Sequence, residues 1–254
     1  MFLIIKNMFK VKIHVFFYIM MFVALFTGNI IDYLVFTCII FVHELGHVFG
    51  GFIFSWRIKK IVILPFGGLT IFDTLINTSL FEQFIVTLLG PFFQICFYFF
   101  ISCFFNLSHS VVYYNFVLLF FNLLPIFPLD GSKFLYVFLC LIFPFKYSHL
   151  ILIFVSFLFI VFVLLFIGHF DLLIYLILMF LLFKCISEFI NHSIIFNKFL
   201  FERYSNNLYF KHVRCVSNPN MMYLWCRHLF GANEKYVTER DFIRKMFDND
   251  YKLW

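Results

Sequence analysis

Three ionisable residues lie within five positions of one another in an otherwise apolar stretch of this sequence. His43, Glu44 and His47 stand in FVHELGHVFG, residues 41–50. Histidines four apart on a helix face the same way, one turn above the other, so two imidazole nitrogens can reach one Zn²⁺ ion. Glu44 projects nearby, where it can take a proton from a water at the metal. The motif therefore predicts a hydrolytic zinc site.

A catalytic zinc ion keeps three protein ligands and one open position, so a third ligand is expected elsewhere. Asp130 in FNLLPIFPLDGSK is the strongest candidate, because Pro125 and Pro128 break an apolar segment there. Irregular backbone at membrane depth is tolerated where it is buried in protein or lines a cavity. Asn122, eight residues before Asp130, can either donate to a developing oxyanion or hydrogen-bond two helices together.

The other histidines are expected to be solvated or interfacial rather than ligands. They are His14, His109, His149, His169, His192, His212 and His228. The seven cysteines are scattered through the chain without a CxxC pair. This pattern favours small buried hydrophobic residues over a disulfide framework or a cysteine metal site.

The composition requires a membrane. Hydrophobic residues make up 64% of the 254 residues, phenylalanine alone supplies 46, and 13% are charged. Soluble globular chains run at about 45–50% apolar, and apolar runs of about 20 residues are typical of transmembrane helices. An ionisable residue inside such a run is costly and is a functional candidate by default. That argument applies to Glu44 and Asp130.

We expect an α-helical polytopic membrane protein with about six spans. They lie near residues 13–31, 33–54, 80–106, 111–129, 149–167 and 171–190, and no cleavage signal follows the first of them. Between the second and third spans, residues 61–72 are β-branched and interrupted by Pro65, Gly67 and Gly68, which favours a short re-entrant hairpin. Residues 133–147 are apolar but too short to span.

The basic residues predict the orientation and the domain division. Of the nineteen Lys and Arg residues, Lys184 lies towards the end of the sixth span, and the other eighteen fall at the termini or in alternate connections of the six-span layout. The positive-inside rule then places both termini in the cytoplasm. Residues 1–191 are expected to form the membrane core. Residues 192–254 carry ten Lys/Arg and six Asp/Glu and are expected to form a small α+β cytoplasmic tail domain.

HELGH in one span and NLLPIFPLDG in a later one resemble the site-2 protease family of intramembrane zinc metalloproteases. The resemblance implies that His43, His47 and Asp130 are the zinc ligands and that Glu44 is the general base. It also implies that Asn122 is the asparagine that flanks the site. One departure from the family pattern lies outside this set, at residue 132, where a serine replaces the usual second glycine.

Further stretches resemble the sporulation branch of that family, over about residues 10–190. They are KIHVFF, SWRIKKIVILPFGG and the Gly90-Pro91 pair. This branch implies a membrane-tethered substrate of the pro-sigma-K type, SpoIVFA-like and BofA-like membrane regulators, and the mother-cell membrane around the forespore. The alternative is a site-2 protease that cuts another membrane-bound regulator, such as an anti-sigma factor. No nucleic-acid partner is expected, and a homo-oligomer is left open.

The resemblance also gives two other segments a role. Residues 61–72 either pair with an unwound substrate by β-augmentation or plug the cavity. The tail resembles one CBS module with shortened strands, in which Thr238 and Asp241 match positions that touch a nucleotide. The simpler interpretation is that Thr238 is a helix N-cap and Asp241 lies in the first turn.

The sequence disfavours two rival functions. A metal transporter needs ligands along a path through the bilayer, whereas the sequence holds one such cluster. An inactive membrane scaffold is disfavoured because Glu44, Asp130 and both histidines of the motif are present.

Overall fold

The computed structural model describes residues 11–64, 67–105, 109–166, 172–206, 208–232 and 235–250. The chain divides into two compact units, one comprising Met1–Thr74 and Phe81–Leu124, the other Leu75–Leu80 and Pro125–Trp254. Lys6, Lys10, Pro65 and His169, on which some sequence expectations depended, lie outside the described residues.

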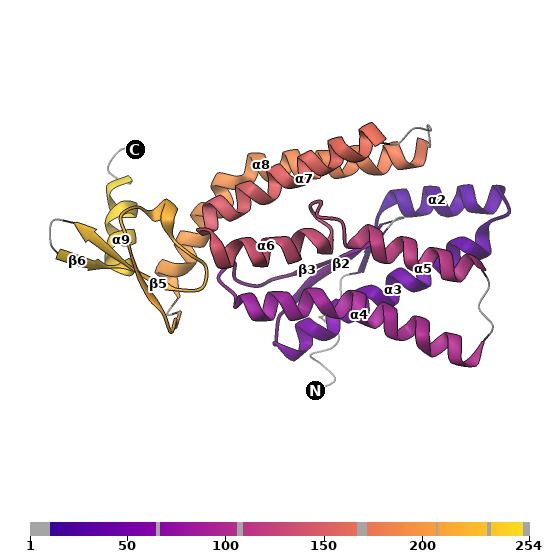
Figure 1. Ribbon diagram of the computed structural model, residues 1–254, viewed down its shortest axis with the longest axis horizontal. Helices are drawn as coiled ribbons and strands as arrows, with labels where there is room; N and C mark the ends of the chain where they lie inside the picture. The colour runs from indigo at the N-terminus through magenta and orange to yellow at the C-terminus, as the bar shows by residue number, and fades with distance from the viewer. Residues whose placement is uncertain are drawn as a thin grey trace. The chain divides into compact units, whose positions relative to one another are not determined.

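The first unit combines apolar helices with a small sheet (Figure 1). Its helices are α2 (Val15–Phe26), α3 (Ile30–Ile53), α4 (Leu80–Phe104) and α5 (His109–Asn122). Its strands are β1 (Val11–Ile13), β2 (Ile58–Leu64) and β3 (Gly67–Phe72). Strand β2 pairs in parallel with β1 and antiparallel with β3, so β3 is an edge of the described sheet.

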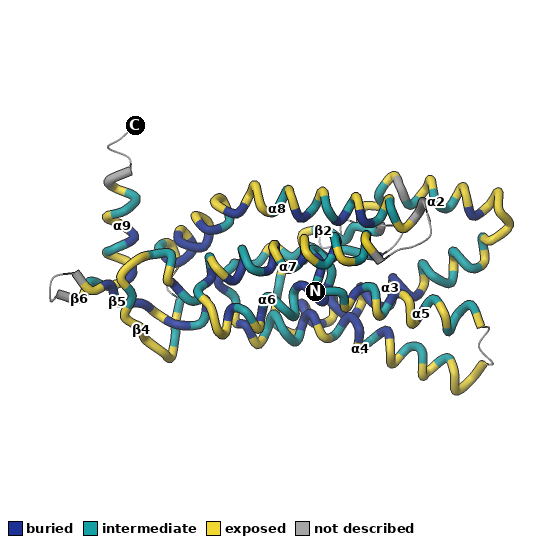
Figure 2. The backbone as a smooth tube through the Cα atoms, turned by 45° about the horizontal axis from the view of Figure 1, so that its top comes forward, coloured by how far each residue is buried: buried dark blue, intermediate teal, exposed yellow. Residues whose placement is uncertain are grey.

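Helix α3 is the central element of this unit because one of its faces is buried. The buried positions recur every three or four residues, which is the repeat of a helix face; they are Ile39, Ile40, His43, Glu44, Gly46, His47, Gly50 and Gly51 (Figure 2). Ile39 and Ile40 pack against Leu118 of α5. The N-terminal part of this buried face is apolar and packs α3 against α5. The following turns carry the predicted site residues His43, Glu44 and His47.

Glycines let α3 and α4 approach closely at the level of the histidines. A Cβ atom at Gly46 would collide with the backbone carbonyl of Leu89, and one at Gly90 would collide with the imidazole of His47. Small residues at helix contacts allow this approach in membrane proteins. The two glycines thus make room for the ring of His47 between the helices.

The second unit joins three helices to a sheet. Helices α6 (Asp130–Ile142), α7 (Phe145–Phe166) and α8 (Leu172–Ser205) precede β4 (Val213–Val216), the 3-10 turn η1 (Pro219–Met221), β5 (Arg227–Ala232), β6 (Lys235–Thr238) and α9 (Glu239–Asp250). Helices α7 and α8 run side by side (Figure 1). Strand β5 is central, parallel to β4 and antiparallel to β6. Phe242 of α9 stacks on Phe230 of β5, with ring centroids 3.9 Å apart.

The chain is an integral membrane protein, but six spans are not confirmed. Four described helices are long and apolar enough to cross a membrane, namely α3, α4, α7 and α8. Helices α2 and α5 have 12 and 14 residues, whereas a span needs about 20. Helix α5 ends at Asn122, shortly before Pro125 and Pro128, which cannot continue it. The paired strands β2 and β3 form the predicted hairpin; its re-entry into a membrane is not confirmed.

The boundary predicted at residues 191 and 192 falls inside α8, which continues to Ser205. The division into a core and a tail domain stays a prediction, nucleotide binding by the tail is not tested, and a CBS module is not shown. At the start of α9, the backbone N–H of Asp241 donates to the Thr238 hydroxyl at 3.3 Å. That bond is the one expected of an N-cap threonine. In the following subsections, "tail" refers to the part of this predicted domain that follows α8, residues 208–232 and 235–250.

The glycine contact between α3 and α4 gives a first testable prediction. Gly46→Ala places a methyl group against a backbone carbonyl that cannot move aside, and overpacking of this kind costs about 1–3 kcal/mol. We expect a lower thermal unfolding midpoint in detergent. Gly231→Ala is the matched control, because a Cβ there meets ordinary van der Waals contacts. Equal midpoints for the two variants would contradict the close approach.

Candidate metal centre

His43 and His47 form the centre of the candidate site. Both side chains are buried, with 2% and 3% of their surface exposed. Their spacing on α3 places one ring a turn above the other, and their Nε2 atoms lie 3.2 Å apart. The two rings meet edge to face, with centroids 4.9 Å apart.

Second partners decide which nitrogen of each ring carries the proton. The Nδ1 atom of His47 lies 2.9 Å from the Val86 carbonyl, which can only accept. The Nδ1 atom of His43 lies 2.9 Å from Oε1 of Gln94. The Gln94 amide nitrogen donates to the backbone and side-chain oxygens of Asn115 at 2.8 and 3.2 Å, so Oε1 is oriented to accept. Both histidines therefore donate from Nδ1.

This arrangement fits a cation. With both protons on Nδ1, each Nε2 presents its lone pair to the other ring across 3.2 Å. Two such lone pairs repel one another unless a positive charge lies between or beside them. Metal-binding histidines usually donate their second ring N–H to a carbonyl or carboxylate, which fixes the tautomer. The donor set thus suits Zn²⁺, which takes imidazole nitrogen readily.

Glu44 faces the hairpin. Its carboxylate is 5% exposed and accepts a hydrogen bond of 2.5 Å from the hydroxyl of Thr70 on β3. Gly68, on the same strand, packs so closely that a Cβ atom there would collide with the Glu44 side chain. Strand β3 therefore holds the predicted general base in one position.

Asn122 lies at the C-terminal end of α5, beside the histidines. Its amide nitrogen is 3.5 Å from Nε2 of His43, and the residue is 7% exposed. An amide N–H can donate to this ring atom because His43 carries its proton on Nδ1. The structure thus brings His43, Glu44, His47 and Asn122 together within the first unit.

Asp130 belongs to the second unit, where it is the first residue of α6. It is 5% exposed, and its carboxylate accepts a 2.8 Å hydrogen bond from Lys133 one turn later. The first turn of a helix is favourable for a carboxylate because backbone N–H groups point towards it. Asp130 is therefore buried and ionisable, as the sequence led us to expect.

The expectation that the remaining histidines are solvated or interfacial is wrong for three of them. His149 and His192 are buried and share a 2.8 Å contact between their Nδ1 atoms, and Glu188 lies 3.0 Å from Nε2 of His149. His228 is fully buried and lies 3.2 Å from Glu239. Their partners lie on other elements, so the sequence alone gave no signal of this pairing.

Sequence analysis also missed Gln94 and Thr70, which hold His43 and Glu44. Gln94 is fully buried within the apolar helix α4, and a polar residue in such a segment is itself a functional candidate. That signal was available in LLGPFFQICF. For Thr70 there was none, since its partner depends on how the hairpin lies against α3.

Known proteins were compared with this chain in sequence and in fold. No family model matches the chain. Among solved structures, the Site-2 Protease from Methanocaldococcus jannaschii is similar, with a TM-score of 0.59, over 72% of this chain and 91% of that one, at 21% identity. The chain has the fold of a site-2 protease. The fold that the resemblance of the motifs implied is thereby confirmed.

A curated protein is similar in sequence to part of this chain. The chain is 39% identical over 82 residues to Stage IV sporulation protein FB of Bacillus subtilis (strain 168). The matched stretch is 32% of this chain and 28% of that protein. The match therefore covers less than a third of the relative's length.

The contact of Gln94 with His43 gives a second prediction. Gln94→Met keeps a similar volume but removes the acceptor for the Nδ1 proton, so the ring loses its fixed orientation. Loss of such an outer partner typically costs about 10–100-fold in metal affinity. We expect that weakening for zinc, measured by competition with a chelator in detergent.

Ser102→Ala is the matched control for Gln94→Met. It also removes a polar group from α4, but the Ser102 hydroxyl is exposed and donates to the Phe99 carbonyl of its own helix. Zinc affinity should be unchanged in this variant. A Gln94→Met protein that holds zinc as tightly as the Ser102→Ala protein would contradict the assigned orientation.

Proposed function

We propose that this chain is an intramembrane zinc metalloprotease that hydrolyses a peptide bond of a membrane-tethered protein. One observation supports the proposal most: two buried imidazoles on an apolar helix turn their unprotonated Nε2 atoms towards one another, with Glu44 beside them. Burying these groups is costly unless they are paired or coordinate a metal. The site-2 protease fold supports the same activity.

Three residues would hold the zinc ion. His43, His47 and Asp130 are buried and offer two imidazole nitrogens and one carboxylate oxygen, a set that could hold a metal ion. Asp130 as the third ligand is part of the proposal. When bound, zinc supplies a Lewis acid that polarises the scissile carbonyl and favours deprotonation of water.

The chain's own residues would carry the proton transfers. Glu44 accepts a proton from the attacking water and returns it to the leaving amine, as a general base and then a general acid. Thr70 keeps the Glu44 carboxylate in place through its 2.5 Å hydrogen bond. The amide of Asn122 is proposed to donate to the oxyanion that forms on the substrate.

The hairpin is the proposed substrate platform. Strand β3 is an edge of the described sheet, and its Thr70 and Gly68 contact Glu44. An unwound substrate segment could pair with this edge by β-augmentation, which would present its peptide bonds to Glu44. In the absence of substrate the same strand would plug the site.

The finer proposal concerns the substrate and its side of the membrane. His47 lies ten residues before Arg57, a basic residue that the positive-inside rule places in the cytoplasm. We therefore propose cleavage near the cytoplasmic face. Similarity to a sporulation protein supports a membrane-tethered sigma factor of the pro-sigma-K type as substrate, with SpoIVFA-like and BofA-like regulators.

The metal assignment is tested by direct measurement. Purified protein in detergent is expected to hold about one zinc ion per chain. His43→Ala and Asp130→Asn should both lower that content, because each removes a ligand. His109→Ala is the matched control, since His109 is exposed at the start of α5. Full zinc occupancy in the His43→Ala protein would show that the site is elsewhere.

The chemistry is tested separately from binding. Glu44→Gln keeps the shape and can still accept a hydrogen bond from Thr70, but it cannot accept a proton at neutral pH. We expect normal zinc content and a cleavage rate lower by about 10²–10⁴-fold. Asp73→Asn removes an exposed carboxylate near the hairpin and should cleave normally. Cleavage by Glu44→Gln at a tenth of the normal rate or more would rule out the role of Glu44.

A further inference from the structure

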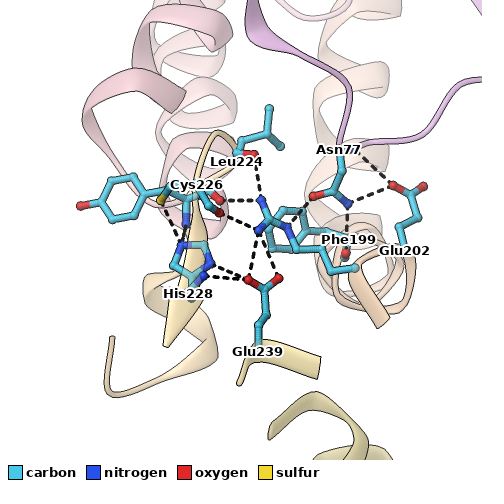
Figure 3. A network of polar contacts seen from close by, with 9 residues as sticks. Asn77, Phe199, Glu202, Leu224, Cys226, His228 and Glu239 are labelled. Atoms are coloured by element: carbon cyan, nitrogen blue, oxygen red, sulfur yellow. Dashed lines mark hydrogen bonds and ion pairs between the residues drawn. The ribbon is translucent and has the colours of Figure 1, made fainter. Parts of the chain in front are cut away.

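Arg203, in the last turn of α8, has every N–H group satisfied although its guanidinium is buried. Nε donates to Oδ1 of Asn77 at 2.7 Å. Nη1 donates to the Cys226 carbonyl at 2.8 Å and to Glu239 at 3.1 Å. Nη2 donates to the carbonyls of Tyr223 and Leu224, both at 2.8 Å. Five donors thus meet five acceptors, in the network of Figure 3.

Asn77 is held by α8 through all of its polar side-chain atoms. Its amide nitrogen donates to the Phe199 carbonyl and to Glu202, both at 3.1 Å, and its backbone N–H donates to Glu202 at 3.1 Å. The residue is 7% exposed. Figure 3 shows Asn77 beside Glu202, and the Asn77 side-chain oxygen accepts from Nε of Arg203. The connection that contains Asn77 is therefore fixed to the end of α8.

The tail supplies the charge that makes burial of Arg203 tolerable. Glu239 lies 3.1 Å from Nη1 and also accepts the backbone N–H of His228 at 2.8 Å. Burial lowers the pKa of His228, although its hydrogen bond to Glu239 opposes this, so the ring is neutral at neutral pH. Arg203 and Glu239 are then the charged pair. Aromatic rings of Phe199 and Phe210 lie over the guanidinium, 4.9 and 4.4 Å away.

Asn77 lies in the short connection between two elements that contact the candidate site. Asn77 follows the end of β3 by five residues and precedes the start of α4 by three. Strand β3 carries Thr70, which holds Glu44. Helix α4 carries Gln94 and Val86, which orient the two histidines. One short connection therefore links both elements that position the candidate site.

We propose that Arg203 is a positioning residue that ties the tail to the connection between β3 and α4. Through Asn77 it fixes both ends of that connection, so the folded tail determines how firmly Glu44 and the histidines are held. A protein partner that separates Glu239 from Arg203 would loosen the site. The effect on catalysis rests on the proposed function, whereas the effect on the order of β3 does not.

A double-mutant cycle tests this coupling. Asn77→Ala releases the connection but leaves the tail contacts of Arg203 in place, and Glu239→Gln weakens the tail contact but leaves Asn77 in place. Amide hydrogen exchange of residues 67–72 reports the order of β3 in the full-length protein. Each single variant is expected to raise that exchange by about tenfold. The double variant should exchange no faster than the more affected single variant.

The outcome that overturns the proposal is additivity. If Arg203 does not couple the two sites, either Glu239→Gln alone leaves β3 exchange unchanged, or both single variants raise it and their fold-changes multiply in the double variant. Asp248→Asn is the matched control, because it removes an ion pair of 3.6 Å on the same helix as Glu239, between exposed side chains. That control should leave β3 exchange unchanged. Accelerated exchange in the control would show that any change in α9 acts on β3 and would also overturn the proposal.

A substitute variant and a kinetic measurement distinguish the positioning role of Arg203 from a loss of folding and from a loss of protease activity. If Glu239→Gln does not fold, Phe210→Leu replaces it in the cycle, since it removes the ring over the guanidinium without removing a charge. The same criterion of non-additivity then applies. On a cleavable substrate, the variants should lower kcat with KM and zinc content unchanged. A wild-type protein without protease activity would refute the proposed function but leave the exchange result valid.

Discussion

Two hydrogen bonds from imidazole Nδ1 atoms decide what this site can do. They commit His43 and His47 to donate to Gln94 and Val86, and so leave both Nε2 atoms facing one another. Much of the first unit follows from the need to keep those acceptors in place. Helix α4 has to lie against α3, and glycines at the contact allow it to do so. Even Asn115 on α5 contributes, because it determines which end of the Gln94 amide faces the ring.

Polar groups in an apolar environment are expensive unless each one has a partner. The candidate site meets that requirement with contacts from four elements: α4 and α5 for the histidines, β3 for Glu44, and α3 itself. A site held by so many elements is preorganised, because the side chains need little reorganisation when charge develops. It is also sensitive to any motion of the elements that hold it. That sensitivity is what makes the connection at Asn77 important.

The sequence predicted what depends on local spacing. The four-residue separation of His43 and His47 fixed their common helix face, and the prolines before Asp130 indicated that the apolar segment there would be broken. Contacts between residues far apart in the chain could not be predicted from the sequence. Gln94 meets His43 across 51 positions, and Arg203 meets Asn77 across 126. Burial of His228 was misjudged for the same reason, since its environment is made by a strand and a helix that pair only in the fold.

The count of six spans is not confirmed for a different physical reason. Hydropathy measures whether a segment is apolar, and the segments around α2 and α5 are apolar. It does not measure where a helix stops. Helix α5 stops at Asn122, so the apolar residues that follow it belong to irregular backbone before α6. The same stop places Asn122 beside His43, so the end of this short helix is also part of the candidate site.

The buried guanidinium of Arg203 has a consequence for biosynthesis. A ribosome makes the chain from its N-terminus, so Asn77 and the whole of α8 exist before the acceptors supplied by Tyr223, Leu224, Cys226 and Glu239. Until those residues emerge, most of the guanidinium's hydrogen bonds can be made only with water or lipid headgroups. Glu239, the last of its partners, lies 36 positions after Arg203. The end of α8 therefore reaches its native environment late, after every apolar helix of the chain has already been synthesised.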